Sequence, residues 1–175
     1  MDKRNIYLIG PMGTGKTAVG RQLARHLRMN FVDSDAQIEA VAGIDIPYIF
    51  EREGEAGFRE REKAMIAQLA EQGPVVVATG GGAVLAPENR QRLSDTGTVV
   101  YLQTSVAQQL QRVRGGRGRP LLKGVDLARR LEELREIREP LYRQIADLTV
   151  ITDNLRVTKV VERIAQELRR ILSPT

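Results

Sequence analysis

Short apolar runs alternate with stretches of helical periodicity along this chain. Five runs have the length and the flanking turn residues of buried strands, at residues 5–9, 30–33, 75–79, 99–103 and 148–152. Between them, apolar residues recur every three or four positions, which is typical of helices with one buried face. The alternation predicts an α/β fold in which helices cover both faces of a parallel sheet.

The two clearest helical stripes lie in the C-terminal half. Their apolar positions are Leu127, Leu131, Leu134 and Leu141 in the first stripe, and Val157, Val160, Val161, Ile164, Leu168 and Ile171 in the second. We expect both stripes to face the core. Residues 114–119, before the first stripe, read Arg-Gly-Gly-Arg-Gly-Arg and are too polar and glycine-rich to pack into a core.

Composition narrows the class of protein. A chain of 175 residues with 42% hydrophobic residues fits a single domain over 1–175. We find no leader pattern and no apolar run near the ~18 residues of a membrane span, so we expect a cytoplasmic protein. The absence of cysteine excludes disulfides and thiolate metal sites. A net charge of +5 is compatible with nucleic-acid binding, but the 4% aromatic content and the lack of a basic tail favour small anionic substrates.

Residues 10–17 form a complete phosphate-binding loop, G-x-x-x-x-G-K-[ST], between the first predicted strand and a helical pattern. Gly10, Gly13 and Gly15 allow the backbone to turn tightly and aim its N–H groups at an anion. Lys16 can reach the outer phosphates, and the Thr17 hydroxyl can ligate Mg²⁺. The loop predicts a protein that binds a nucleoside triphosphate.

Two carboxylates end the second predicted strand, in the order Asp33-Ser34-Asp35. Alternate side chains of an extended segment point the same way, so both could face one ligand. One could hold magnesium through water and the other could accept a hydroxyl proton. The alternative is that one of them caps the following helix; the nearby phosphate-binding loop favours the functional interpretation.

Three glycines follow the third predicted strand, Gly80, Gly81 and Gly82. Such a run costs backbone entropy and adds no packing, so it indicates a close approach of the backbone to another group. We expect a backbone platform under the acceptor substrate rather than a flexible turn.

Arginines supply the remaining signal. Arg59, Arg119 and Arg138 each lie in a distinctive segment, Phe-Arg-Glu-Arg-Glu, Arg-Pro-Leu-Leu and Arg-Glu-Pro-Leu-Tyr. Each could be solvated surface, but two arginine forks converging on one pocket would specify a carboxylated acceptor. Spacing alone does not choose among the arginines of this chain.

Taken in order, these motifs resemble those of the shikimate kinases. The resemblance covers nearly the whole chain and includes G-x-x-G-x-G-K-T, D-x-D, F-R-x-x-E, T-G-G-G, R-P-L-L and R-x-P-L-Y. It implies a nucleoside-monophosphate-kinase-like fold with a five-stranded parallel sheet ordered 2-3-1-4-5 and a mobile lid. The implied activity is MgATP-dependent phosphorylation of the shikimate 3-hydroxyl, a cytoplasmic step of aromatic amino-acid biosynthesis.

The resemblance also implies roles for residues that match the family motifs. Asp35 would bind the shikimate hydroxyls and act as base, within a substrate-binding region at about 34–61. Arg59 and Arg138 would grip the carboxylate, and Asp33 would support magnesium beside Thr17. The remaining contacts implied are Gly80, Gly81 and Gly82 to the substrate, and Gly13, Thr14, Gly15, Lys16, Thr17 and Ala18 to ATP.

For the lid, the resemblance implies a segment at about 112–123 that closes to bring Arg119 onto the transferring phosphate, where a planar donor fork stabilises developing charge. We expect Arg117 to be merely solvated. The implied adenine contacts are Arg112 or Arg114 at the base of the lid, and Arg156 before the last helix.

Other functions stay open. The nearest is kinase activity on another hydroxy acid such as gluconate, and a more distant one is nucleotide-dependent nucleic-acid binding through 112–119. A regulatory nucleotidase is disfavoured, because neither N-K-x-D nor D-x-x-G follows the phosphate-binding loop. We expect a monomer with no nucleic-acid or membrane partner, and a structural rather than catalytic His26.

Overall fold

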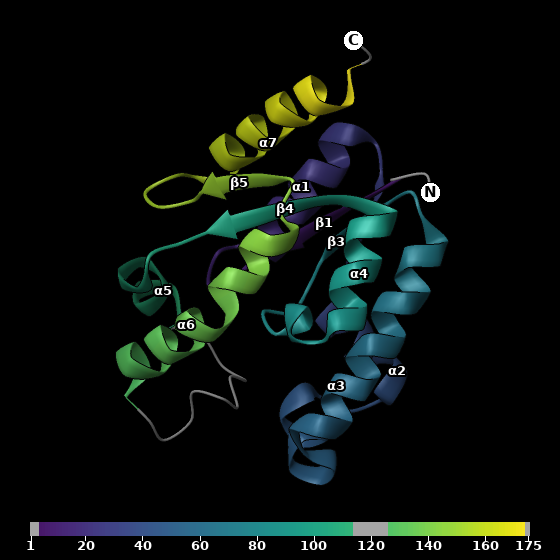
Figure 1. Cartoon of the computed structure of the whole chain (residues 1–175), viewed down its shortest axis with the longest axis vertical. Helices are drawn as coiled ribbons and strands as arrows, with labels where there is room; N and C mark the ends of the chain where they lie inside the picture. The colour runs from purple at the N-terminus through teal and green to yellow at the C-terminus, as the bar shows by residue number, and fades with distance from the viewer. Residues whose placement is uncertain (1–3, 114–125, 174–175) are drawn as a thin grey trace.

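One parallel sheet organises the molecule, a computed structural model that describes residues 4–113 and 126–173 (Figure 1). Its strand order is β2-β3-β1-β4-β5, and every neighbouring pair is parallel. This confirms the expected order 2-3-1-4-5. The strands are β1 (Asn5–Ile9), β2 (Asn30–Asp33), β3 (Val75–Ala78), β4 (Gly97–Gln103) and β5 (Leu148–Ile151).

The helices and a short 3₁₀ segment connect these strands. They are α1 (Lys16–Leu27), α2 (Ser34–Ala42), α3 (Ile46–Gln72), η1 (Ala83–Leu85), α4 (Pro87–Thr96), α5 (Val106–Val113), α6 (Leu127–Ile145) and α7 (Val157–Leu172). Aspartates cap three of them, because a carboxylate satisfies an amide that the first helical turn leaves unpaired. Asp33, Asp45 and Asp126 accept from the amides of Ala36, Tyr48 and Arg129.

Both faces of the sheet are buried under helices. Successive strand residues point to opposite faces, so Tyr7 and Ile9 join one core cluster while Ile6 and Leu8 join the other. The first cluster includes residues of α3, α4 and α6, and the second includes residues of α1 and α7. In Figure 1, α7 lies above the sheet and α3, α4 and α6 lie below it. Two-sided burial explains why the inner strands β1, β3 and β4 are mostly apolar, whereas the edge strands β2 and β5 are only partly buried.

The predicted boundaries differ from the structure by one or two residues. β1 and β2 match, β3 and β5 end one residue earlier than expected, and β4 begins two residues earlier. The expectation that Ile171 faces the core is wrong, because its side chain is 43% exposed. The last α7 residue in the core cluster is Leu168, so Ile171 lies one turn beyond the part of the helix that packs on the sheet.

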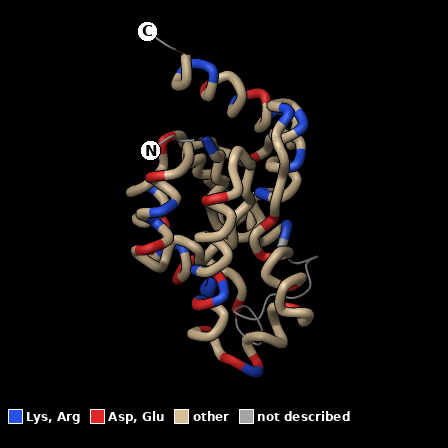
Figure 2. Tube along the Cα trace, turned by 90° about the vertical axis from the view of Figure 1, so that its right-hand side faces the viewer, with Lys and Arg blue, Asp and Glu red and all other residues tan. Residues whose placement is uncertain are grey.

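Charged residues lie on the helices and loops that surround the sheet. Figure 2 shows both signs interspersed along the peripheral helices, and strands that are mostly uncharged. His26 is exposed in the last turn of α1. Among the residues that the structure describes, no helix is long and apolar enough to cross a membrane.

Candidate active site

The phosphate-binding loop joins β1 to α1 at the carboxyl edge of the sheet, where open α/β sheets bind their ligands. The first turn of α1 begins at Lys16, so its unpaired amides face the loop as an anion site would require. Lys16 Nζ donates to the carbonyl oxygens of Gly10 at 2.7 Å and Pro11 at 2.8 Å. These bonds hold the ammonium over the loop.

Helix α5 holds the same loop from its other side. The buried Gln109 donates to the carbonyl of Met12 at 2.8 Å, and Arg112 donates to the carbonyl of Gly13 at 2.9 Å. Arg112, expected as a nucleotide contact, therefore lies directly against the loop.

A cavity of about 440 Å³ opens beside the loop and brings together three of the predicted motifs. Its walls come from the phosphate-binding loop, the residues after β2, and the residues after β3. The lining residues are Met12, Gly13, Gly15, Lys16, Thr17, Ala18, Asp33, Asp35, Thr79, Gly80, Gly81 and Arg112.

Asp33 caps the following helix, which is the alternative considered for it, and it also binds the Thr17 hydroxyl. Its Oδ1 accepts from the amide of Ala36 at 3.0 Å and caps α2, while its Oδ2 accepts from the Thr17 hydroxyl at 2.6 Å. A hydroxyl from the first turn of α1 and a carboxylate from the end of β2 fit Mg²⁺, which usually takes one or two protein oxygens and completes its shell with phosphates and water. In the described part of the chain no group of three or more acidic, histidine or cysteine side chains could form a larger metal cage.

The premise that Asp33 and Asp35 share an extended segment is wrong. β2 ends at Asp33 and α2 begins at Ser34, so Asp35 lies in the first helical turn. Both carboxylates still line the same cavity. They do so because the chain turns from strand to helix between them, and not because of strand alternation.

Asp35 is the most perturbed acid in this cavity. Its Oδ1 is buried and accepts no hydrogen bond from the protein. Burial, with a further contribution from the nearby Asp33 charge, raises the pKa of Asp35 from 3.8 to about 6, although Lys16 and Arg59 oppose the rise. A carboxylate with an unused oxygen and a raised pKa is suited to accept a proton.

The glycine run packs closely against neighbouring side chains and is not a loose turn. A Cβ on Gly80 would lie 2.7 Å from Asp35 Oδ1 and 3.1 Å from Glu62 Oε2. A Cβ on Gly82 would lie 2.4 Å from an Arg59 guanidinium nitrogen. The missing side chains therefore make room for charged groups of the site.

Arg59 reaches the glycine run from α3, held by two acids of the same helix. It donates to Glu62 Oε1 at 2.9 Å and to Glu55 Oε1 at 3.2 Å. Glu62 is 1% exposed, and burial raises its pKa although Arg59 lowers it. The sequence analysis predicted no role for Glu62. A signal was available, because Glu62 lies three residues after Arg59 and the buried residues Met65, Ile66 and Leu69 follow it.

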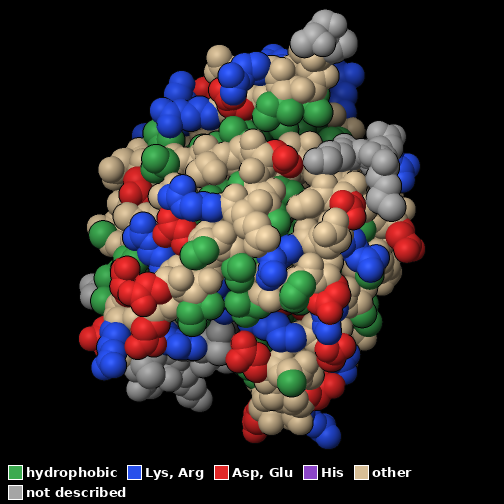
Figure 3. All heavy atoms as spheres, viewed as in Figure 1, with side chains coloured by type: hydrophobic (Ala, Val, Ile, Leu, Met, Phe, Trp, Pro, Cys, Tyr) green, Lys and Arg blue, Asp and Glu red, His purple; other side chains and the backbone are tan. Residues whose placement is uncertain are grey.

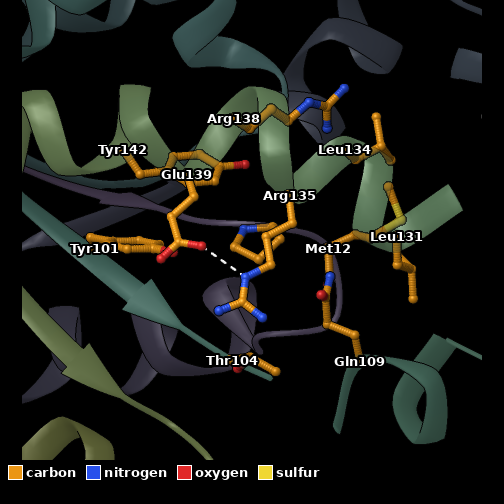
Figure 4. Close-up of a pocket in the computed structure, with 11 residues that line it drawn as sticks. Met12, Tyr101, Thr104, Gln109, Leu131, Leu134, Arg135, Arg138, Glu139 and Tyr142 are labelled. Carbon is orange, nitrogen blue, oxygen red and sulfur yellow. Dashed lines mark hydrogen bonds and ion pairs between the residues drawn. The ribbon is translucent and has the colours of Figure 1, made fainter. Parts of the chain in front are cut away.

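Arg138 reaches the same run from α6. It is 4% exposed, and burial lowers its pKa. Four residues later, the Tyr142 hydroxyl donates to the carbonyl of Gly81 at 2.5 Å. Figure 4 shows Arg138 and Tyr142 on one helix, with the Tyr142 ring over Tyr101, beside a small cavity of about 20 Å³. Sequence reasoning also missed Tyr142.

A second large cavity, of about 360 Å³, is lined by Thr14 and Gly15 of the phosphate-binding loop. Arg112 lines both cavities, and Arg156 lines the second one just before α7 begins. The other residues around it are Thr14, Gly15, Val19, Thr152, Leu155, Val157 and Val160. Arg114, Arg117 and Arg119, with most of the expected lid, lie outside the described residues.

The phosphate-binding loop, the 2-3-1-4-5 sheet and the acceptor-sized cavity beside the loop define a P-loop kinase of small molecules. Residues 12–169 match the family model described as Shikimate kinase. The chain belongs to the shikimate kinase family.

Individual relatives agree with this assignment. The chain is 54% identical over 167 residues to a shikimate kinase of Hahella chejuensis, covering 95% of this chain and 87% of that protein. It is 56% identical over 165 residues to one of Thioalkalivibrio sulfidiphilus, covering 94% and 87%. A shikimate kinase from Acinetobacter baumannii, solved in complex with shikimate, superposes with a TM-score of 0.95 at 45% identity, covering 97% of this chain and 95% of that chain. A gluconokinase from Sinorhizobium meliloti, with a TM-score of 0.64 and 18% identity, shares the fold.

Proposed function

We propose that this protein transfers the γ-phosphoryl group of ATP to the 3-hydroxyl of shikimate. The observation that carries the proposal is Asp35, a buried carboxylate with an unused oxygen, which lines the cavity of the phosphate-binding loop and lies against the same glycine run as Arg59 and Arg138. An acceptor that has both a hydroxyl and a carboxylate needs a base, such as Asp35, and cationic groups, such as Arg59 and Arg138. The Acinetobacter relative with the same fold was solved with shikimate bound.

The donor nucleotide would occupy the loop and the second cavity. Residues 13–18 would bind the phosphates, with Lys16 as a charge on the outer phosphates and Thr17 and Asp33 as the magnesium ligands. Magnesium would supply neutralisation of the phosphate charge. Adenine would lie in the second cavity between Arg112 and Arg156, which line it.

The acceptor would lie between the glycine run and α3. Arg59 and Arg138 would hold its carboxylate, with the backbone of Gly80, Gly81 and Gly82 beneath it. Asp35 would orient the hydroxyl and take its proton as the phosphoryl group arrives. The role expected for Arg119, stabilising the transferring phosphate, stays a prediction.

A coupled ADP-release assay with shikimate, gluconate and other hydroxy acids tests the proposal, with Lys16→Ala as the inactive control. We expect ATP- and magnesium-dependent turnover with shikimate, and a kcat/KM for gluconate lower by ~10³-fold or more, because an open-chain acid whose carboxylate binds Arg59 and Arg138 does not present its hydroxyl groups to Asp35 in the geometry of the ring. Comparable turnover with gluconate would contradict the proposal and favour the related hydroxy-acid kinase.

We also propose a monomer without a nucleic-acid partner. The face drawn in Figure 3 mixes both signs of charge over its surface. Light scattering after gel filtration would check the first expectation. A salt-sensitive shift of an oligonucleotide would contradict the second. Cytoplasmic location stays a prediction from the family resemblance.

A further inference from the structure

Two side chains of helix α6 approach the same glycine of the run that would lie beneath the acceptor. Arg138 and Tyr142 are four residues apart and so lie on the same face of the helix. The position of a Cβ on Gly81 is 3.4 Å from an Arg138 guanidinium nitrogen, and the Gly81 carbonyl accepts from the Tyr142 hydroxyl. The Arg138 guanidinium and the Tyr142 hydroxyl therefore converge on the same glycine.

The Tyr142 hydroxyl therefore ties the helix that carries Arg138 to the backbone of the glycine run. It donates to the Gly81 carbonyl, and the Arg138 guanidinium lies against the same glycine. Burial holds the pKa of Tyr142 well above its ordinary value, so the phenol stays protonated and remains a donor throughout the physiological range. Its ring is stacked on Tyr101, with centroids 5.0 Å apart and planes at 25° (Figure 4).

The bond to the Gly81 carbonyl also orients the next amide. In a planar trans peptide the carbonyl and the following N–H point in opposite directions, so the Gly82 N–H points away from Tyr142. The backbone bonds of this turn run from Ala83 to Gly80 and from Leu85 to Gly82. Neither of these bonds uses the N–H group of Gly81 or Gly82. The turn therefore orients these two N–H groups without using them as donors.

From this geometry we infer that Tyr142 is a positioning residue for the acceptor, which acts through Arg138 and the Gly81–Gly82 peptide without contacting the reacting atoms. The inference rests on the proposed function. It makes the affinity for the acceptor depend on a tyrosine hydroxyl that lies behind the glycine run. Donor binding should not depend on it, because the phosphate-binding loop is held by Lys16, Gln109 and Arg112 instead.

The test is Tyr142→Phe, which removes only the hydroxyl, with Tyr101→Phe as the matched control on the other ring of the same stack. We expect Tyr142→Phe to raise the KM for shikimate about tenfold, as loss of one hydrogen bond to a charged or preorganised group typically does. The KM for ATP and kcat should stay within about twofold, and Tyr101→Phe should leave both KM values within about twofold. A general structural defect would not separate the two substrates in this way.

A double-mutant cycle tests whether the effect runs through Arg138. In an Arg138→Lys background, Tyr142→Phe should raise the shikimate KM by only about threefold or less, because coupled residues are not additive. An unchanged shikimate KM in Tyr142→Phe, an equal rise in both KM values, or a full tenfold effect in the Arg138→Lys background would each overturn the inference. If the parent enzyme does not phosphorylate shikimate at all, the proposed function itself is wrong, and that result is seen before any variant is compared.

Discussion

Replacing Asp35 by asparagine should make the free protein more stable while it removes most of the activity. The physical reason is the burial of the carboxylate, which raises its pKa from 3.8 to about 6. At 1.36 kcal/mol per pH unit, ionising Asp35 costs about 3 kcal/mol more in the folded protein than in the unfolded chain. Asparagine has nearly the same shape and no charge to desolvate.

The sign of the pH dependence follows from the direction of the pKa change. Protonated Asp35 is favoured by folding, so its contribution to stability is fully present below pH ~3.8 and is lost as the pH rises through ~6. Asp35→Asn should therefore match the parent at low pH and exceed it above pH 6. At pH 7.5 the gain in the free energy of unfolding should approach, but not exceed, ~3 kcal/mol.

Urea unfolding between pH 4 and 8, without nucleotide or metal, measures this difference. Asp95→Asn, which removes a carboxylate of α4 that pairs with Gln91, is a control for the loss of charge as such. The kcat of Asp35→Asn should fall by about 10²- to 10⁴-fold, the usual effect of losing a positioned base. A stability gain that is absent at pH 7.5, or that grows toward acid, would refute the assignment of Asp35 as a desolvated carboxylate.

Further predictions concern the other parts of the site. Lys16→Ala should abolish phosphoryl transfer and leave the circular dichroism melt nearly unchanged, and normal turnover in this variant would exclude the role of the loop. Arg59→Lys and Arg138→Lys should each raise the shikimate KM about tenfold or more with little effect on the KM for ATP, because lysine loses the planar fork; an equal loss of ATP affinity would place them on the wrong ligand. Gly82→Ala should raise the shikimate KM as Arg59→Lys does, because its Cβ would lie 2.4 Å from an Arg59 guanidinium nitrogen and would displace that group from the site. An unchanged shikimate KM in Gly82→Ala would contradict the close packing of Arg59 on the platform.

The sequence predicted the features of this protein that depend on local pattern. The apolar runs located the five strands, most clearly the inner strands β1, β3 and β4, because strands buried on both faces leave a nearly continuous apolar signature. The phosphate-binding loop was equally visible, since all its parts lie within eight consecutive residues. The strand order and the choice of Arg59 and Arg138 came from the family resemblance and not from spacing.

Contacts between distant segments could not be predicted in the same way. Tyr142 and Gly81 are 61 positions apart, and nothing in the local sequence around either residue indicates that one orients the other. Asp35 was assigned to the correct cavity for an incorrect reason, because the exact residue at which β2 becomes α2 decides where its side chain points. The ends of elements are the least certain part of any pattern-based prediction, and here the candidate site lies at such an end.

Buried charge explains why the acceptor site needs so many supporting residues. Asp35 and Glu62 are partly desolvated acids with raised pKa values, and Arg138 is a buried base with a lowered one. Each of these charges costs stability, so the site persists only because the sheet and its two cores are stable without it. The ion pair of Arg59 with Glu62 offsets part of that cost while it fixes the Arg59 guanidinium in place. Removing the charge of a residue that supports the site in this way should lower the acceptor affinity and raise the stability. Truncating a core residue should lower both.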